Sequence, residues 1–152
     1  MLVVLLLMGI LAGLVSVTTR PDDRGQLQIE AERLMQLLNL AADESRFTGK
    51  PIGWTADATG YRFWRQSADG DWREIRDNDL LRARVLPQNM QISDMRVEAR
   101  RPQGAMRLEF RPYGAALSFA IDMSFGAQRF SVLSSPLGDI RVQAGVEQAN
   151  AR

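Results

Sequence analysis

The chain begins with an apolar run, and this run limits what the protein can be more than any other feature. Every residue from 1 to 15 is apolar or glycine, and the first charge is Arg20. A signal peptide needs a basic segment before its apolar stretch and a small-residue cleavage site after it, and neither is found here. A spanning helix needs about 20 apolar residues, so the run is slightly short for that role. A buried core helix is the third alternative.

A second helical pattern follows the apolar run, and it favours the membrane anchor over the other two readings. Pro21 and its polar neighbours predict a kink between residues 20 and 25. Beyond Gln26, apolar residues recur at helical spacings until Thr48-Gly49-Lys50-Pro51, a typical helix stop. This spacing places Glu30 and the other charged residues of the segment on the remaining, polar faces. We therefore expect a transmembrane and assembly helix over residues 1–19 and its amphipathic continuation over residues 20–49.

Acidic residues in three places are better explained by local structure than by a metal or acid–base site. Asp22 and Asp23 follow Pro21, which favours capping of the second helical segment, where negative charge is stabilising. The stretches ADGD at 68–71 and DNDL at 77–80 do not fit the twelve-residue calcium loop. We predict that both are turns.

Beyond Pro51 the apolar period changes from that of a helix to that of strands. Strands are expected over residues 52–54, 61–66, 71–75, 91–99, 106–110 and 117–125, and around Phe130 to Val132 and Ile140 to Val142. The Asp69-Gly70 step predicts a hairpin, whereas residues 77–86 are ambiguous between a helical turn and a strand. Alternation places Phe63 and Trp64 on opposite faces. The sequence thus predicts an α+β protein with a β domain over residues 50–143 and a flexible tail over 144–152.

The composition excludes several kinds of chemistry. Cysteine and histidine are absent, so there is no disulfide, thiolate metal site, Ser-His pair or Cys-His pair. An anchored envelope enzyme is therefore the least favoured hypothesis, and no cofactor or metal is expected. The net charge is only +1, which argues against a nucleic-acid partner. The basic residues Arg96, Arg100, Arg101, Arg107 and Arg111 lack interleaved aromatic stacking platforms and are interpreted as a solvated face.

Residues 1–14, MLVVLLLMGILAGL, resemble the N-terminal helix of type IV pilins and type II secretion pseudopilins. The stretches AADESRFTGKPIGW, GYRFWR and LEFRPYGAALSF, followed by GDIRV, look most like the H-type minor pseudopilin of that superfamily. The superfamily's basic leader, cleaved Gly, N-methylated Phe and following Glu are not found in this sequence, so the resemblance starts some positions inside the mature helix. The resemblance implies a long helix packed on a β-sandwich of two antiparallel sheets, and a structural, non-enzymatic protein.

The resemblance also implies a function and a location. It implies a subunit of the periplasmic pseudopilus, in its tip complex, that helps export folded proteins across the outer membrane. The chain would cross the bacterial inner membrane once, with its C-terminal domain in the periplasm. The implied partners are other minor pseudopilins and the major pseudopilin, with secreted substrates and the secretin as further candidates. The alternative is a minor type IV pilin engaged in pilus assembly or DNA uptake, for which Arg141 and Arg152 give thin support.

Candidate functional residues follow from these hypotheses. Membrane anchoring and fibre packing are assigned to Leu2, Val3, Val4, Leu5, Leu6, Leu7, Gly9, Ile10, Leu11, Gly13, Leu14 and Val15. Within this set, Gly9 and Gly13 form a G-x-x-x-G pattern that allows close helix approach. Packing of the second helical segment on its own domain is assigned to Leu27, Ala31, Leu34 and Leu38. Arg20 alone would favour the wrong orientation for an exported domain, and we expect the basic leader to correct this.

Overall fold

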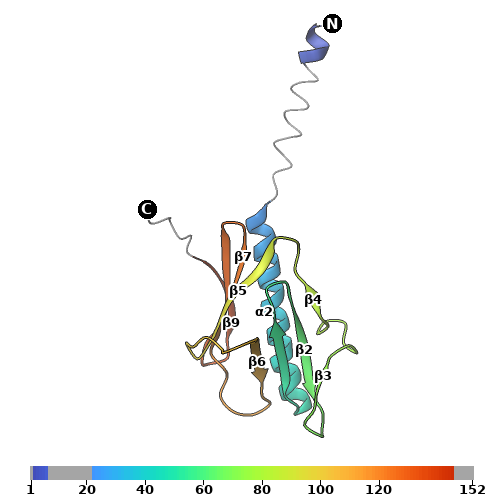
Figure 1. Ribbon diagram of the computed structural model, residues 1–152, viewed down its shortest axis with the longest axis vertical. Helices are drawn as coiled ribbons and strands as arrows, with labels where there is room; N and C mark the ends of the chain where they lie inside the picture. Colours follow the sequence, from blue (N-terminus) through green and yellow to red (C-terminus); the bar gives the residue numbers. More distant parts are fainter. Residues whose placement is uncertain (1, 7–21, 146–152) are drawn as a thin grey trace.

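The computed structural model describes residues 2–6 and 22–145 (Figure 1). Residues 2–6 form a short helical segment with exposed side chains. The rest of the described chain consists of helix α2 (Asp23–Thr48) followed by nine β-strands. The predicted α+β class is therefore correct.

Helix α2 begins and ends where its capping residues require. The Asp22 side chain accepts a hydrogen bond of 3.0 Å from the backbone N–H of Gly25, which satisfies one of the free donors of the first turn. At the other end Gly49 adopts a left-handed backbone with φ 70°, and its N–H donates to the carbonyl of Ser45. The predicted cap at Asp22 and the predicted stop at Thr48-Gly49 are confirmed.

The strands form two antiparallel sheets. Sheet A contains β1 (Ile52–Ala56), β2 (Gly60–Gln66), β3 (Trp72–Glu74), β4 (Arg84–Val85) and β6 (Met106–Phe110). Its order is β3-β2-β1-β6, with β4 paired to β2. Sheet B contains β5 (Met90–Val97), β7 (Phe119–Phe125), β8 (Gln128–Ser134) and β9 (Ile140–Ala144), in the order β5-β7-β8-β9. All described pairings are antiparallel, and consecutive strands are joined mostly by short turns.

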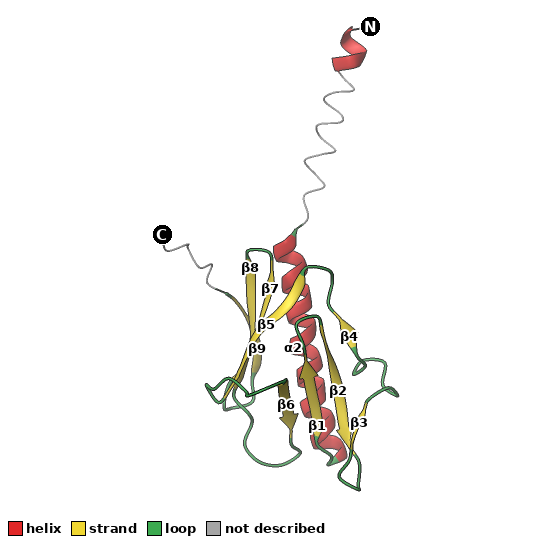
Figure 2. Ribbon diagram, viewed as in Figure 1, coloured by secondary structure: helices red, strands yellow, loops and turns green. Residues whose placement is uncertain are grey.

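The apolar face of α2 is buried against both sheets. In Figure 2 the helix runs along the middle of the molecule, with β7 and β9 on one side and β2 and β3 on the other. It contacts β7, β8 and β9 of sheet B and β1 and β6 of sheet A. Trp54 and Phe63 of sheet A and Ile121 and Val132 of sheet B are fully buried in one core. The helix is thus the element that both sheets share.

Several strand boundaries differ from the sequence prediction for identifiable reasons. The strand expected over 91–99 ends at Val97, because Glu98 and Ala99 adopt positive φ in a turn. The strand expected from residue 117 begins at Phe119. The N–H of Ser118 donates to the Glu98 carboxylate and not to a carbonyl of a neighbouring strand. The ambiguous stretch 77–86 forms only the two-residue strand β4. Strand β9 runs to Ala144, one residue into the expected tail, and residues 146–152 lie outside the described chain.

Candidate functional site

The residues assigned to anchoring and fibre packing are only partly described. Leu2, Val3, Val4, Leu5 and Leu6 lie in the short helical segment, and their exposed fractions range from 57% to 85%. Leu7, Gly9, Ile10, Leu11, Gly13, Leu14 and Val15 lie outside the described residues. Within the ranges 2–6 and 22–145, no helix combines the length and apolar character that crossing a membrane requires.

The four residues assigned to packing of the helix on its domain lie in the core. Leu27, Ala31, Leu34 and Leu38 have no exposed surface. Sequence reasoning missed Ser45, two turns beyond Leu38 on the same stripe, because a serine carries no apolar signal. Its hydroxyl is buried and donates a hydrogen bond of 2.9 Å to the carbonyl of Phe110 at the end of β6. This bond ties the last turns of α2 to the edge of sheet A.

Sequence reasoning also gave the wrong environment for Glu30. The periodicity put it on a polar face of the helix, but the residue lies on the buried side and is only 6% exposed. It forms ion pairs with Arg33 on the next turn and with Arg84 on β4, whose Nη2 lies 3.0 Å from Oε1. A buried carboxylate needs such partners because it has lost its water. The hydrogen bond from Arg84 to Glu30 raises the pKa of Arg84 above its usual value.

Tyr61 lies on the inner face of sheet A, close to this ion-pair cluster. The residue is 2% exposed, and its hydroxyl finds no hydrogen-bond partner among the described residues. Burial raises the pKa of Tyr61 from 10.0 to about 12, because the phenolate would lose its hydration. The group stays neutral and inert at physiological pH, so it offers no acid–base chemistry there.

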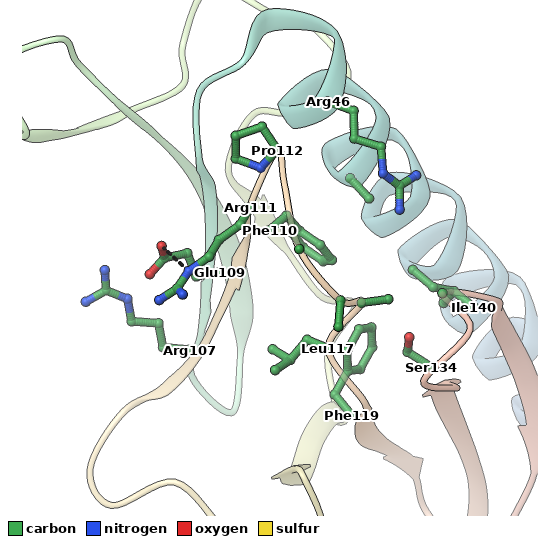
Figure 3. A pocket seen from close by; sticks show the side chains of 15 residues that line it. Arg46, Arg107, Glu109, Phe110, Arg111, Pro112, Leu117, Phe119, Ser134 and Ile140 are labelled. Atoms are coloured by element: carbon green, nitrogen blue, oxygen red, sulfur yellow. Dashed lines mark hydrogen bonds and ion pairs between the residues drawn. The ribbon is translucent and has the colours of Figure 1, made fainter.

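A crevice of about 460 Å³ lies between the C-terminal end of α2, the edge strand β6 and the adjoining ends of β7, β8 and β9. Its apolar lining is Phe110, Leu117, Phe119 and Ile140, and its charged lining is Arg46, Arg107, Glu109 and Arg111 (Figure 3). One ion pair joins two of these charges, with Arg111 Nε 3.3 Å from Glu109 Oε1. The lining thus holds three cations and one anion, and it is positive overall.

A shallower depression of about 230 Å³ lies on the face of sheet A that is turned away from α2. It is lined by Gly53, Thr55, Trp64, Trp72 and Arg107. Both indole rings are half-buried, whereas Phe63, the neighbour of Trp64, is fully buried. The predicted division of Phe63 and Trp64 between opposite faces is therefore confirmed. We call these five residues the tryptophan face.

The two acidic stretches singled out in the sequence lie in turns, and the clustered arginines lie exposed on β5, β6 and the turns that follow these strands. Among the described residues, no three His, Cys, Asp or Glu side chains gather closely enough to hold a metal ion. Residues 68–71 form part of the turn between β2 and β3, and Asn78 accepts backbone hydrogen bonds within its own turn. Of the clustered arginines, Arg96, Arg101 and Arg111 pair with Asp122, Asp94 and Glu109. Arg100 and Arg107 form no ion pair among the described residues. Arg107 lies over the Trp72 ring instead, so the expectation that this cluster lacks aromatic stacking neighbours is wrong for Arg107.

A capped amphipathic helix packed on antiparallel sheets is the architecture of pilin-like proteins. Two solved structures of the minor pseudopilin EpsH from the type II secretion system of Vibrio cholerae have the same fold. The first has a TM-score of 0.62 and 20% identity and covers 78% of this chain and 97% of the EpsH chain. The second has a TM-score of 0.64 and 16% identity and covers 80% and 97%. At these identities the likeness establishes the fold.

The family is established by sequence. The model of the family described as "Type II transport protein GspH" matches residues 30–141, so the chain belongs to the GspH family of type II secretion pseudopilins. A comparison with curated protein sequences found no match. The family match covers most of α2 and the sheets and excludes the apolar run, so it is independent of that run. It confirms the resemblance to H-type pseudopilins and the expectation of a structural, non-enzymatic protein.

Proposed function

We propose that this protein is a subunit of the pseudopilus tip complex and helps to export folded proteins across the outer membrane. The observation that carries the proposal is the family match over residues 30–141, because it identifies the domain rather than the anchor. The same match favours secretion over the alternative of a DNA-uptake pilin.

The mechanism we propose uses one helix in two environments. Residues 1–19 would anchor the subunit in the inner membrane, with residues 50–143 in the periplasm. On assembly the apolar residues would exchange lipid for the helices of neighbouring subunits. Both surroundings exclude water, so the exchange costs little hydrophobic free energy. Gly9 and Gly13 would allow close approach of those helices.

The domain must follow the helix when the fibre moves, and the contacts of α2 support this. Leu27, Leu34 and Leu38 are fully buried along its length. Arg84 holds the N-terminal half through Glu30, and Phe110 holds the C-terminal half through Ser45. Both of these bonds lead to sheet A, whereas the buried leucines pack in the core that sheet B shares. A pull on the N-terminus of the helix would therefore be transmitted to both sheets. Other minor pseudopilins and the major pseudopilin are the proposed partners, with secreted substrates and the secretin as later contacts.

The test is deletion of the gene with complementation, followed by co-purification of the detergent-solubilised full-length protein with other pseudopilins of the same genome. We expect deletion to stop the release of secreted proteins and co-purification to recover at least one minor pseudopilin. Normal secretion in the deletion strain would contradict the proposal. Co-purification with the major pseudopilin alone would contradict the tip assignment. Salt-sensitive DNA binding without either result would favour the uptake pilin.

A further inference from the structure

The tryptophan face stands out because it carries large aromatic residues that lie outside the hydrophobic core. The inner face of sheet A packs on the hydrophobic core, and there Trp54 and Phe63 have no exposed surface. The outer face carries Trp64 and Trp72, and no described element packs over them. Large aromatic residues on an uncovered sheet face, together with arginine, are the composition of protein-interface centres rather than of ordinary surfaces.

The two indoles are held in place by the strands beneath them. Trp64 donates from Nε1 to Thr55 Oγ1 over 2.8 Å, which fixes its ring along the sheet. Trp72 extends from the edge strand β3 toward β1, and its Cζ3 lies 3.2 Å from the position that a Cβ on Gly53 would occupy. Glycine at position 53 therefore leaves the space that the ring fills. A rigid aromatic surface loses little conformational entropy when it binds.

Arg107 supplies the charge of this surface. Its guanidinium lies over the Trp72 ring, 5.3 Å from the centroid, which is within cation–π range. It forms no ion pair within the residues that the structure describes, whereas the neighbouring Glu109 is paired with Arg111. A carboxylate from outside the chain can approach Arg107 without displacing an existing partner.

The same arginine connects the tryptophan face to the crevice. Arg107 lines both, so one surface runs from Trp64 across β6 to the end of α2. Figure 3 shows Arg107 and Glu109 on the side of β6 away from the helix and Phe110 on the side toward it. Aromatic rings line this path together with Arg46, Arg107 and Arg111, and Glu109 is the one acidic residue in the two linings. A partner segment that is apolar and acidic would complement such a surface.

We propose that the tryptophan face docks an acidic segment of another pseudopilin, with an apolar side chain against Trp64 and Trp72 and a carboxylate on Arg107. This inference rests on the proposed function, which supplies the partner class, and it assigns the contact to particular residues. The partner's segment continues over β6 toward Arg46 and Arg111. The indoles contribute buried area, and Arg107 sets the register through its charge.

The experiment is site-specific photo-crosslinking in cells that carry the whole secretion system. A photoreactive residue replaces Arg62 in the full-length protein, since Arg62 is on the same face of β2 as Trp64 and its side chain is 60% exposed. We expect a crosslink to another pseudopilin. Trp72→Ala and Arg107→Glu should each lower its yield about ten-fold, the size expected for truncation of an interface centre.

Two matched variants separate this docking from general damage. Phe47→Ala removes an aromatic side chain that is 90% exposed. Arg101→Glu reverses a charge in the turn after β5. Neither residue lines the tryptophan face or the crevice. Both should keep the crosslink within two-fold of the wild-type yield, by analogy with contacts outside an interface centre. An acidic residue of the partner changed to arginine should restore the yield with Arg107→Glu.

Three results would overturn the inference. The first is an unchanged crosslink with Trp72→Ala and Arg107→Glu. The second is a crosslink only to a second copy of this chain. The third is the absence of a crosslink from position 62 while the protein still co-purifies with other pseudopilins and supports secretion, which leaves the proposed function intact. A protein that neither co-purifies nor supports secretion overturns both.

Discussion

Sheet A carries aromatic residues on both faces, and the two faces differ in what those residues contribute. On the inner face Trp54, Tyr61 and Phe63 are at most 2% exposed, and their rings contact one another at centroid distances of 6.1 and 6.0 Å. On the outer face Trp64 and Trp72 are half-buried and contact the sheet from one side only. The inner aromatics are explained by folding, whereas the outer ones retain surface that only a partner can cover. The comparison predicts that stability depends on the first group and assembly on the second.

Trp54→Ala should show the largest effect on stability. The residue is fully buried among Tyr61, Phe63 and α2, so truncation leaves a cavity and should lower the free energy of unfolding by about 3–5 kcal/mol. Urea unfolding of the full-length protein in detergent, followed by circular dichroism, measures the loss. The matched change Trp72→Ala on the outer face should cost about 1 kcal/mol or less. Equal losses for the two variants would contradict the distinction between the faces.

Alkaline pH should destabilise the protein through Tyr61 on the inner face. Burial raises the pKa of Tyr61 from 10.0 to about 12, so between these values the folded chain keeps a proton that the unfolded chain has lost. The contribution of Tyr61 to the free energy of unfolding is therefore fully present below pH 10. It falls as the pH rises toward 12, by about 3 kcal/mol in total. Urea midpoints measured from pH 8 to pH 12 should show this slope.

Tyr61→Phe provides the control for the alkaline slope. Phenylalanine cannot ionise, so the part of the slope that Tyr61 causes should disappear. The variant also removes a buried hydroxyl that has no partner among the described residues, and it should therefore be as stable as the wild type at pH 8, or more stable by up to about 1 kcal/mol. A full slope in the variant would assign the alkaline loss to another group.

Arg84 and Arg62 extend the comparison of the two faces from aromatic residues to ion pairs. Arg84→Ala leaves the buried Glu30 with Arg33 as its remaining cation and should cost about 1–3 kcal/mol. Arg62→Ala removes an outer-face arginine that is 3.9 Å from Glu74 and well exposed, and it should cost less than about 1 kcal/mol. Urea unfolding of the two variants measures the difference. A larger loss for Arg62→Ala would contradict the buried role of Glu30.

The sequence predicted those parts of the fold in which one apolar period extends over several turns or a whole strand. Leu27, Leu34 and Leu38 repeat over three turns of α2. The alternation around Leu108 predicted β6 with the bounds that the structure has, Met106–Phe110. Asp22 was identified as a cap because the capping hydrogen bond is local. Strand β3 was predicted through the Asp69-Gly70 hairpin signal, and its antiparallel pairing with β2 confirms it. Strand β4 is too short to carry a period, and its place depends on pairing with β2.

The candidate surfaces were less accessible to sequence reasoning because they depend on register between strands. Alternation predicted that Phe63 and Trp64 differ in exposure, but it could not say which faces the core. Glu30 was misplaced because its burial requires Arg84, 54 residues along the chain. Trp72, Gly53 and Arg107 meet only because β3, β2, β1 and β6 are neighbours in sheet A. No spacing in the chain indicates that contact.

Gly53→Ala is the smallest and most specific change that separates the two faces. The new Cβ would lie 3.2 Å from Cζ3 of Trp72, so the ring must shift by a few tenths of an ångström toward solvent. No positive φ opposes alanine there, and the loss of glycine's freedom in the unfolded chain favours the variant. Stability in urea should therefore change by less than about 1 kcal/mol, while the crosslink from position 62 weakens.

Gly60→Ala is the contrasting control, because its Cβ would lie 2.4 Å from the backbone oxygen of Arg84, which cannot shift without disturbing β4. If Gly53→Ala lowered stability as much as Gly60→Ala, the outer indoles would belong to the folding core after all.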